Sequence, residues 1–245
     1  MIGLGTIVNT AAIVAGGICG LLFRRFLQER FQETITRAMG FAILVMSLGG
    51  TLSQMLVVNL TGSGGQLTAS LDTQGTVMLV ISLAAGGLVG ELLNLELWLQ
   101  RFGTWLRDRT GSQGDGQFIS AFVSASLTVC VGAMAIIGSI QDGISGDHAT
   151  LFAKSVLDMI IITMMTASLG KGCIFSAIPV ALFQGAVTLL ANEAAPLMTE
   201  AALSNISLVG NVLILCVGVN LIRPQTIRVA NVLPAVVIAA AFAAL

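Results

Sequence analysis

Charged residues are scarce in this chain. Lys, Arg, Asp and Glu make up 9% of its 245 residues, against about 25% in an ordinary soluble domain, while 56% of the residues are hydrophobic. This composition excludes a soluble globular protein and predicts a protein embedded in lipid. With only four prolines, the sequence also lacks a charged or proline-rich linker, so we expect a single integral membrane domain over residues 1–245.

Several functional classes lack support in the sequence. The four cysteines, Cys19, Cys130, Cys173 and Cys216, lie in apolar stretches without CxxC spacing, so we expect packing residues rather than a metal site or disulfides. No nucleotide-binding loop is present, so ATP-driven transport would need another subunit. The net charge of −1 is segregated between basic and acidic loops, which argues against nucleic acid as a partner. We expect no cofactor.

Apolar stretches long enough to cross a bilayer alternate with short polar loops. A span needs about 20 residues to cross a hydrocarbon core of about 30 Å. We therefore predict an all-α fold, a polytopic transmembrane helical bundle of about eight spans, with a Gly/Ser/Thr-rich outer loop at residues 61–75. The spans are expected at residues 2–23, 38–60, 76–95, 117–140, 149–169, 173–191, 206–222 and 229–245.

The positive charges indicate the orientation. Of the 11 Lys and Arg residues, four lie in residues 24–37, three in 101–109, one at 171 and two in 223–228, while Lys154 lies inside a span. Because cytoplasmic loops carry an excess of Lys and Arg, these four stretches are expected inside and both termini outside. The first span has no basic residue before it, which argues against a cleaved signal peptide.

Two cytoplasmic segments have an amphipathic pattern. Apolar residues recur at helical spacing over residues 23–35, and the second segment carries an aromatic stripe that includes both tryptophans of the chain. These residues are Phe23, Leu27, Phe31 and Ile35 in the first segment, and Trp98, Phe102 and Trp105 in the second. We expect two interfacial helices that anchor the chain to the membrane surface, with partner binding or regulation as the alternative.

A repeated pattern links the first and third spans. Residues 16–20 (GGICG) recur as residues 86–90 (GGLVG), and residues 27–31 (LQERF) recur as residues 99–102 (LQRF), at an offset of 70 to 72 residues. Because the copies lie two spans apart, they predict an internal parallel repeat. The glycine pairs favour close helix packing, and the Gly-rich faces favour a homo-oligomer.

Lys154 and Asp158 interrupt the apolar pattern of the fifth span. Their spacing of four residues places them on one helix face, and at about 1.5 Å per residue Asp158 lies about 13 Å below a helix start at Ala149. An isolated ion at that depth costs about 2.5–3.5 kcal/mol on insertion scales, so we expect the two to pair. The other candidate site residues are Ser155, Gln184 and Asn9 within spans, and Gln141, Asp142 and Asp147 at the outer entrance.

Two interpretations of this cluster stay open. In the structural one, Lys154 and Asp158 form a buried pair while Asp142 and Asp147 cap helix ends or shape a turn. In the functional one, Asp158 is the titrating group of a binding or proton-relay site and Lys154 tunes it. Intramembrane ionisable residues favour the functional interpretation, so we predict a transporter or channel for a small solute or ion. The main alternative is a sensor, scaffold or assembly factor without transport.

An intramembrane protease is a remote third interpretation. Residues 143–146 match the G-x-S-G of rhomboid-type serine proteases, and His148, the only histidine, lies three residues after Ser145. Rhomboid-like catalysis takes its base from a different helix, so this spacing argues against proteolysis and we expect no enzyme activity.

The polar run around the cluster resembles a known family. Residues 132–143 (GAMAIIGSIQDG), 146–147 (GD) and 153–158 (AKSVLD) closely resemble the signature of the YdfK/YqgA family of uncharacterised bacterial inner-membrane proteins. Residues 5–9 (GTIVN) and 229–235 (VANVLPA) resemble that family too, so the resemblance covers the whole chain. It implies a location in the bacterial plasma (inner) membrane and a transport role, without naming a substrate.

Overall fold

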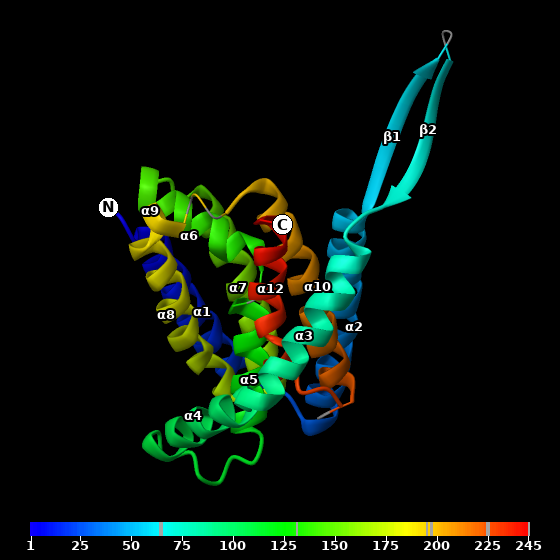
Figure 1. The fold of residues 1–245 in the computed structure, drawn as a ribbon. Helices are drawn as coiled ribbons and strands as arrows, with labels where there is room; N and C mark the ends of the chain where they lie inside the picture. Colours follow the sequence, from blue (N-terminus) through cyan, green and yellow to red (C-terminus); the bar gives the residue numbers. More distant parts are fainter. Residues whose placement is uncertain (64–65, 131, 195, 197, 224–225, 245) are drawn as a thin grey trace.

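The computed structural model is a bundle of helices from which one β-hairpin projects (Figure 1). The structure describes residues 1–245 except 64–65, 131, 195, 197, 224–225 and 245. Within the described residues, six helices are long and apolar enough to cross a membrane, and a bent pair makes a seventh span if its halves count as one. The predicted all-α polytopic bundle is confirmed.

The spanning helices form where apolar runs continue without a break. They are α1 (Leu4–Arg24), α2 (Glu29–Met55), α3 (Thr76–Leu93), α7 (Ala149–Leu169), α8 (Ala177–Leu189) with the 3-10 turn η1 (Lys171–Ser176) before it, and α10 (Glu200–Ile222). The bent pair is α5 (Phe118–Cys130) and α6 (Ala133–Ser145). The shorter elements are α4 (Leu95–Arg109), α9 (Ala191–Ala194), α11 (Val229–Val232), α12 (Pro234–Ala241) and η3 (Phe242–Ala244).

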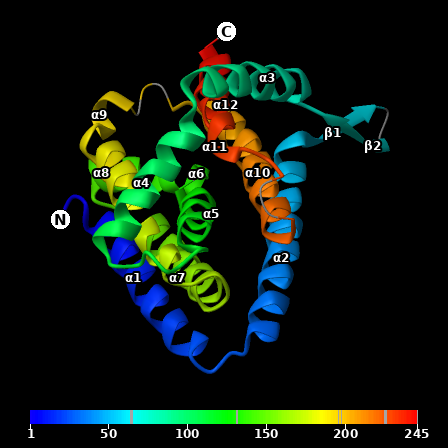
Figure 2. The same ribbon diagram turned by 90° about the horizontal axis from the view of Figure 1, so that it is seen from below.

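The helices form two groups, which Figure 2 shows from below. One group holds α1, α5, α6, α7 and α8, and its most extensive contact is between α1 and α7. The other holds α2, α3, α10, α11 and α12, with α2 packed along α10. Contacts of α2 with α7 and of α10 with α5 join the groups. The apolar core of the first group includes Ile13, Ile162 and Val180, and the same cluster extends to Ile43 of α2 and Leu221 of α10.

The predicted second span and the loop after it are wrong in part. Helix α2 ends at Met55, and residues 56–60 continue as strand β1 (Leu56–Ser63), which pairs antiparallel with β2 (Gln66–Thr73). The predicted loop at residues 61–75 is therefore mostly part of a hairpin that projects away from the bundle (Figure 1). The β-branched Val57 and Val58 favour a strand over a helix, a signal that the high hydropathy of the region concealed.

Two other predicted spans differ from the structure. The fourth is broken into α5 and α6, whose axes differ by 60°. The last predicted span, residues 229–245, contains only the short helices α11, α12 and η3, because Pro234 starts a new helix instead of continuing α11. The apolar stretch Val229–Ala241 is shorter than a span needs, so the described residues do not reproduce eight helices of spanning length.

One of the two predicted interfacial helices is wrong and the other forms. Residues 23–35 are split, because α1 ends at Arg24 and the spanning helix α2 begins at Glu29. By contrast, α4 is a separate helix that Asn94, with a positive φ of 52°, divides from α3. Its buried side faces the bundle through Leu106, whereas Trp98 and Trp105 are 65% and 52% exposed, as interfacial anchors would be.

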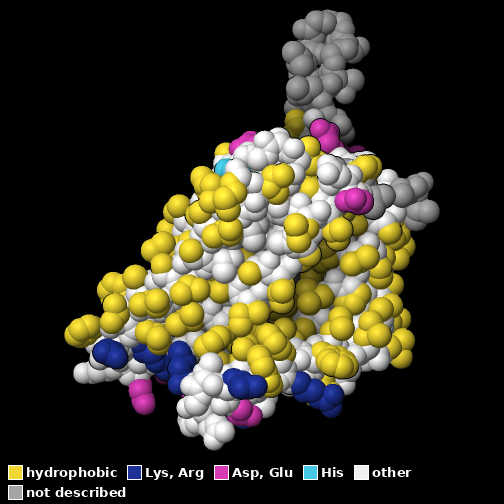
Figure 3. All heavy atoms as spheres, turned by 90° about the vertical axis from the view of Figure 1, so that its left-hand side faces the viewer, with side chains coloured by type: hydrophobic (Ala, Val, Ile, Leu, Met, Phe, Trp, Pro, Cys, Tyr) yellow, Lys and Arg dark blue, Asp and Glu magenta, His cyan; other side chains and the backbone are white. Residues whose placement is uncertain are grey.

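The charges are arranged along the long axis of the bundle. Figure 3 shows the face of the molecule that lies at the left in Figure 1. On that face the Lys and Arg side chains gather at the end near α4, below a broad apolar belt. The hairpin and both termini lie toward the opposite end (Figure 1). This arrangement agrees with the pattern from which we inferred the orientation, and the orientation itself stays a prediction.

The repeated glycines pack helices closely. A side chain at Gly16 would meet the Met159 carbonyl of α7, and one at Gly86 would meet the backbone of Ala235 on α12. Gly87, directly beside Gly86, has open space around it. The predicted parallel repeat and the predicted homo-oligomer stay predictions.

Gly86→Ala should destabilise the fold, whereas Gly87→Ala should not. The added methyl at Gly86 forces α3 away from α12, and such overpacking costs about 1–3 kcal/mol. Thermal unfolding and size-exclusion chromatography of the purified variants in one detergent check this. Equal stability of the two variants would contradict the close α3–α12 packing.

Candidate functional site

Helix α7 carries an ion pair inside the bundle. The Lys154 Nζ donates to Asp158 Oδ2 at 2.6 Å and to Oδ1 at 2.8 Å, one helical turn along. Both residues are buried, with 8% and 3% of their surface exposed. The structure thus places Lys154 and Asp158 in contact near the middle of a helix of spanning length.

The break between α5 and α6 adds a backbone ligand to this pair. Lys154 Nζ also donates to the Val129 carbonyl oxygen at 2.9 Å. Because α5 ends at Cys130, no helical turn follows among the described residues to donate amides to the carbonyls of its last turn. The ammonium therefore lies at the negative end of a helix dipole. The sequence analysis did not predict Val129, because the contact is made by its backbone carbonyl and its side chain type does not indicate such a contact.

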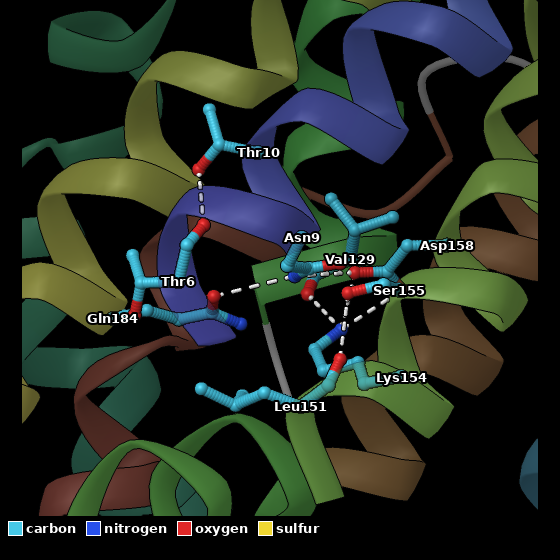
Figure 4. A network of polar contacts seen from close by, with 9 residues as sticks. All are labelled: Thr6, Asn9, Thr10, Val129, Leu151, Lys154, Ser155, Asp158 and Gln184. Carbon is cyan, nitrogen blue, oxygen red and sulfur yellow. Dashed lines mark hydrogen bonds and ion pairs between the residues drawn. The ribbon is translucent and has the colours of Figure 1, made fainter. Parts of the chain in front are cut away.

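Two amides from α1 and α8 complete the network (Figure 4). Asn9 Nδ2 donates to Asp158 Oδ2 at 3.1 Å and to Gln184 Oε1 at 3.3 Å. Asn9 and Gln184 are 0% and 1% exposed. Ser155 lies beside the pair, but its hydroxyl donates to the Leu151 carbonyl of its own helix. Side chains or backbone of α1, α5, α7 and α8 therefore meet at one buried point.

Two polar atoms in this network are left over. Among the residues that the structure describes, the buried Asn9 Oδ1 and Gln184 Nε2 have no hydrogen-bond partner. An unpaired buried polar atom costs about 1–3 kcal/mol, so such atoms are normally satisfied by water or a ligand. The network therefore offers an acceptor and a donor to a further molecule.

The three residues predicted at the outer entrance make local contacts near the ends of α1, α6 and α7, and their entrance role stays a prediction. Asp142 on α6 accepts from the backbone N–H groups of Gly3 and Gly5 at 3.0 Å each, which ties it to the N-terminus of α1. His148 Nδ1 lies 3.0 Å from Asp142 Oδ1, although the angles do not make this contact a hydrogen bond. A carboxylate at a helix N-terminus is stabilised by the helix dipole.

Gln141 and Asp147 make similar local contacts. Gln141 Oε1 accepts from Thr150 Oγ1 at 2.7 Å, and Asp147 Oδ1 accepts from the Ala149 N–H at 3.0 Å, at the start of α7. Within the described residues, no hydrogen bond joins Gln141, Asp142 or Asp147 to the ion pair. The geometry of Asp142 and Asp147 favours the helix-capping interpretation, because both accept from backbone N–H groups at helix starts.

A surface groove runs beside the network. It has a volume of about 670 Å³ between α1 and α8 and is mostly apolar. Its lining includes Thr6 and Thr10, which flank Asn9 on α1, but neither Lys154 nor Asp158.

Comparison with known proteins places the chain in a family. The family model described as "Protein of unknown function (DUF554)" matches residues 4–244. The chain belongs to this family. It is 27% identical over 234 residues to "Uncharacterized membrane protein YdfK" of Bacillus subtilis (strain 168), covering 96% of this chain and 93% of that protein. It is 26% identical over 240 residues to "Uncharacterized protein YqgA" of Escherichia coli (strain K12), covering 96% and 94%. No solved structure matches the chain.

These matches confirm the resemblance drawn from the sequence. The family match spans the membrane helices and the polar network together, since it runs from the first residue of α1 to residue 244. The names of these two relatives state no substrate. What the site does must therefore be argued from its chemistry.

Asp142→Asn should loosen the outer end of α1, whereas Asp147→Asn should have a small effect. The amide of Asn would turn an N–H toward one of the two backbone donors, leaving a buried group unpaired at a cost of about 1–3 kcal/mol. Thermal unfolding and hydrogen exchange of residues 3–9 measure this. If exchange there stays at the wild-type rate, Asp142 does not fix α1.

Proposed function

We propose that the protein transports a small solute or ion across the membrane through the site formed by Lys154, Asp158, Asn9 and Gln184. The observation that carries the proposal is the buried ion pair at the meeting point of four helices. Ionisable residues inside the membrane are costly and mark substrate pathways or proton relays in many transporters.

The broken helix supports the same proposal. Transporter sites near the bilayer midplane are often built from discontinuous helices, whose freed carbonyls and helix ends coordinate ions. The α5–α6 break supplies the Val129 carbonyl in this way. Asp158 lies nine residues after the start of α7, about 13 Å along the helix at 1.5 Å per residue, which is near the midplane of a span.

The proposal includes no catalytic chemistry. The hydroxyl of Ser145 donates to the Gln141 carbonyl at 2.8 Å, and His148 Nδ1 faces Asp142. Neither contact supplies the serine–base pair that proteolysis would need.

The proposal also includes a location and an orientation. A bacterial inner membrane is supported by the organisms of both relatives, and the name of one includes the word membrane. Termini outside are supported by the gathering of Lys and Arg at the opposite end of the bundle (Figure 3).

Asp158→Asn should reduce flux by about tenfold or more in the folded protein, although it also lowers stability because Lys154 loses its buried counter-charge. Hydrogen bonds to charged groups are worth about 1.5–3 kcal/mol, and this change removes the charge but keeps the shape. The measurement is charge movement in proteoliposomes on a solid-supported membrane, with a panel of protons, metal cations, anions, amino acids and organic acids. An electroneutral exchange would be followed with a pH-sensitive dye trapped inside the vesicles.

Glu193→Gln is the matched control, because it removes a carboxylate from the short helix α9, away from the ion pair. It should keep wild-type flux. If the folded wild type gives neither charge movement nor a change in the trapped dye, the transport proposal is wrong for charged and proton-coupled solutes. If function depends instead on Trp105, on the exposed aromatic face of α4, and not on Asp158, the protein acts as a scaffold.

A further inference from the structure

We infer that the site takes a small uncharged solute that carries a carboxamide or urea group, and that Asn9 and Gln184 bind this group directly. The inference deepens the proposed transport function and rests on the same site. It names a class of substrate, which neither the family match nor the names of the relatives provide.

The orientations of the two side-chain amides follow from their partners (Figure 4). Asn9 turns its Nδ2 toward Asp158 Oδ2, because a carboxylate that is bound to Lys154 only accepts hydrogen bonds. The same Nδ2 donates to Gln184 Oε1, so Gln184 turns its oxygen toward Asn9. Exchanging O and N in either amide would bring two donors or two acceptors together. The two atoms left without a partner among the described residues are therefore one acceptor, Asn9 Oδ1, and one donor, Gln184 Nε2.

A third amide supplies the two missing groups. Asn9 donates to Gln184, so a carboxamide that accepts from Gln184 Nε2 and donates to Asn9 Oδ1 closes a ring of three amides. Each member of that ring donates once and accepts once. An ester or a tertiary amide has no N–H and leaves Asn9 Oδ1 unpaired. Because Asn9 and Gln184 are 0% and 1% exposed, an unpaired atom there is costly, and the site selects for a solute with both groups.

The charges around the two atoms disfavour ions. Lys154 and Asp158 are neutral as a pair, so a charged solute would add an uncompensated charge inside the bundle. The N–H groups of Gln184 disfavour a cation, and the Asp158 carboxylate beside Asn9 disfavours an anion. The three donors of Lys154 are directed to the Val129 carbonyl and the two oxygens of Asp158, so none is left for an anion.

The residues above and below the two amides differ in polarity. One turn toward the end of the bundle where Lys and Arg gather, α1, α7 and α8 carry Ile13, Ile162 and Val180, each 0% exposed. One turn toward the hairpin end, the hydroxyls of Thr6 on α1 and Thr188 on α8 lie 3.4 Å apart, longer than a usual hydroxyl hydrogen bond. Thr6 also lines the groove between α1 and α8. The solute therefore reaches the amides past Thr6, and apolar packing closes the other side.

The test compares four small uncharged solutes in wild-type protein. Proteoliposomes are exposed to urea, acetamide, glycerol or N,N-dimethylacetamide, and swelling is followed by stopped-flow light scattering with protein-free liposomes as the background. Glycerol has no amide, and N,N-dimethylacetamide has no N–H. We expect the protein-dependent rate for urea or acetamide to exceed that for either control solute by about tenfold or more, because each control leaves a buried atom unpaired. Binding is measured separately by saturation-transfer NMR of acetamide with protein in lipid nanodiscs. If folded wild type binds acetamide no better than N,N-dimethylacetamide, water alone satisfies the two atoms and the inference is wrong.

Matched variants identify the binding residue. Gln184→Met removes the free donor but keeps a side chain of similar length, while Asn9 keeps its bond to Asp158. We expect it to bind acetamide about tenfold more weakly, the loss of roughly one hydrogen bond. Gln54→Met makes the same change in α2, where the amide accepts from Ser204 of α10, and should behave as wild type. Unchanged acetamide binding by folded Gln184→Met would overturn the assignment. If that variant does not fold, the selectivity of the wild type among the four solutes decides.

The same measurements separate this inference from the transport proposal. Binding of acetamide without flux of any solute would support the amide site and contradict transport. Flux of a charged solute that depends on Asp158, with neither binding nor flux of an amide, would support transport and overturn the amide site.

Discussion

The burial of one ammonium–carboxylate pair constrains the surrounding helices. Taking Lys154 and Asp158 out of water carries a desolvation penalty that only close geometry and further hydrogen bonds offset. Helix α7 cannot supply those bonds alone, because its own backbone groups are used within the helix. The bonds come from Asn9 of α1 and from the end of α5, so both elements must approach α7 closely.

Glycines and terminal contacts make that approach possible for α1. At Gly16 and Gly20 of α1, the space where a side chain would start is occupied by α7 backbone. The ends of α1 are fixed as well, by Asp142 at its first residues and by the bond from Arg24 to the Ser168 carbonyl. Helix α1 is thus attached to the α6–α7 region at both ends. Asn9, between them, is positioned by contacts that lie outside the site.

The sequence predicted those parts of the site that side-chain spacing determines. Lys154 and Asp158 are one turn apart on an apolar helix, so their contact follows from helical geometry. The sequence indicates Asn9 and Gln184 only as polar residues within two other spans, and their spacing does not determine that they approach Asp158 or each other. Val129 could not be predicted, because its contribution is a backbone carbonyl that becomes free only where the helix breaks.

The errors in the fold have a common physical origin. Hydropathy reports whether a segment is apolar, but not whether its backbone is helical or long enough to cross the membrane. Residues 56–60 are apolar and form a strand, while residues 229–241 are apolar and interrupted at Pro234. In residues 23–35 the apolar residues keep a helical spacing although the chain turns between α1 and α2. The end of α1 and the start of α2 together therefore resemble one amphipathic helix in the sequence.

The unpaired atoms bear most directly on the choice between a structural pair and a working site. Well-packed apolar residues often replace a buried ion pair at no loss of stability, so the pair alone is weak support for a stabilising role. A pair kept for structure would be expected to have all its neighbours satisfied, because each unpaired buried group lowers stability. Here Asn9 bonds Asp158 through one amide atom and leaves the other without a partner in the described residues, as does Gln184. The network thus keeps one acceptor and one donor open to water or to a further ligand, and the proposed transport site would use these two atoms.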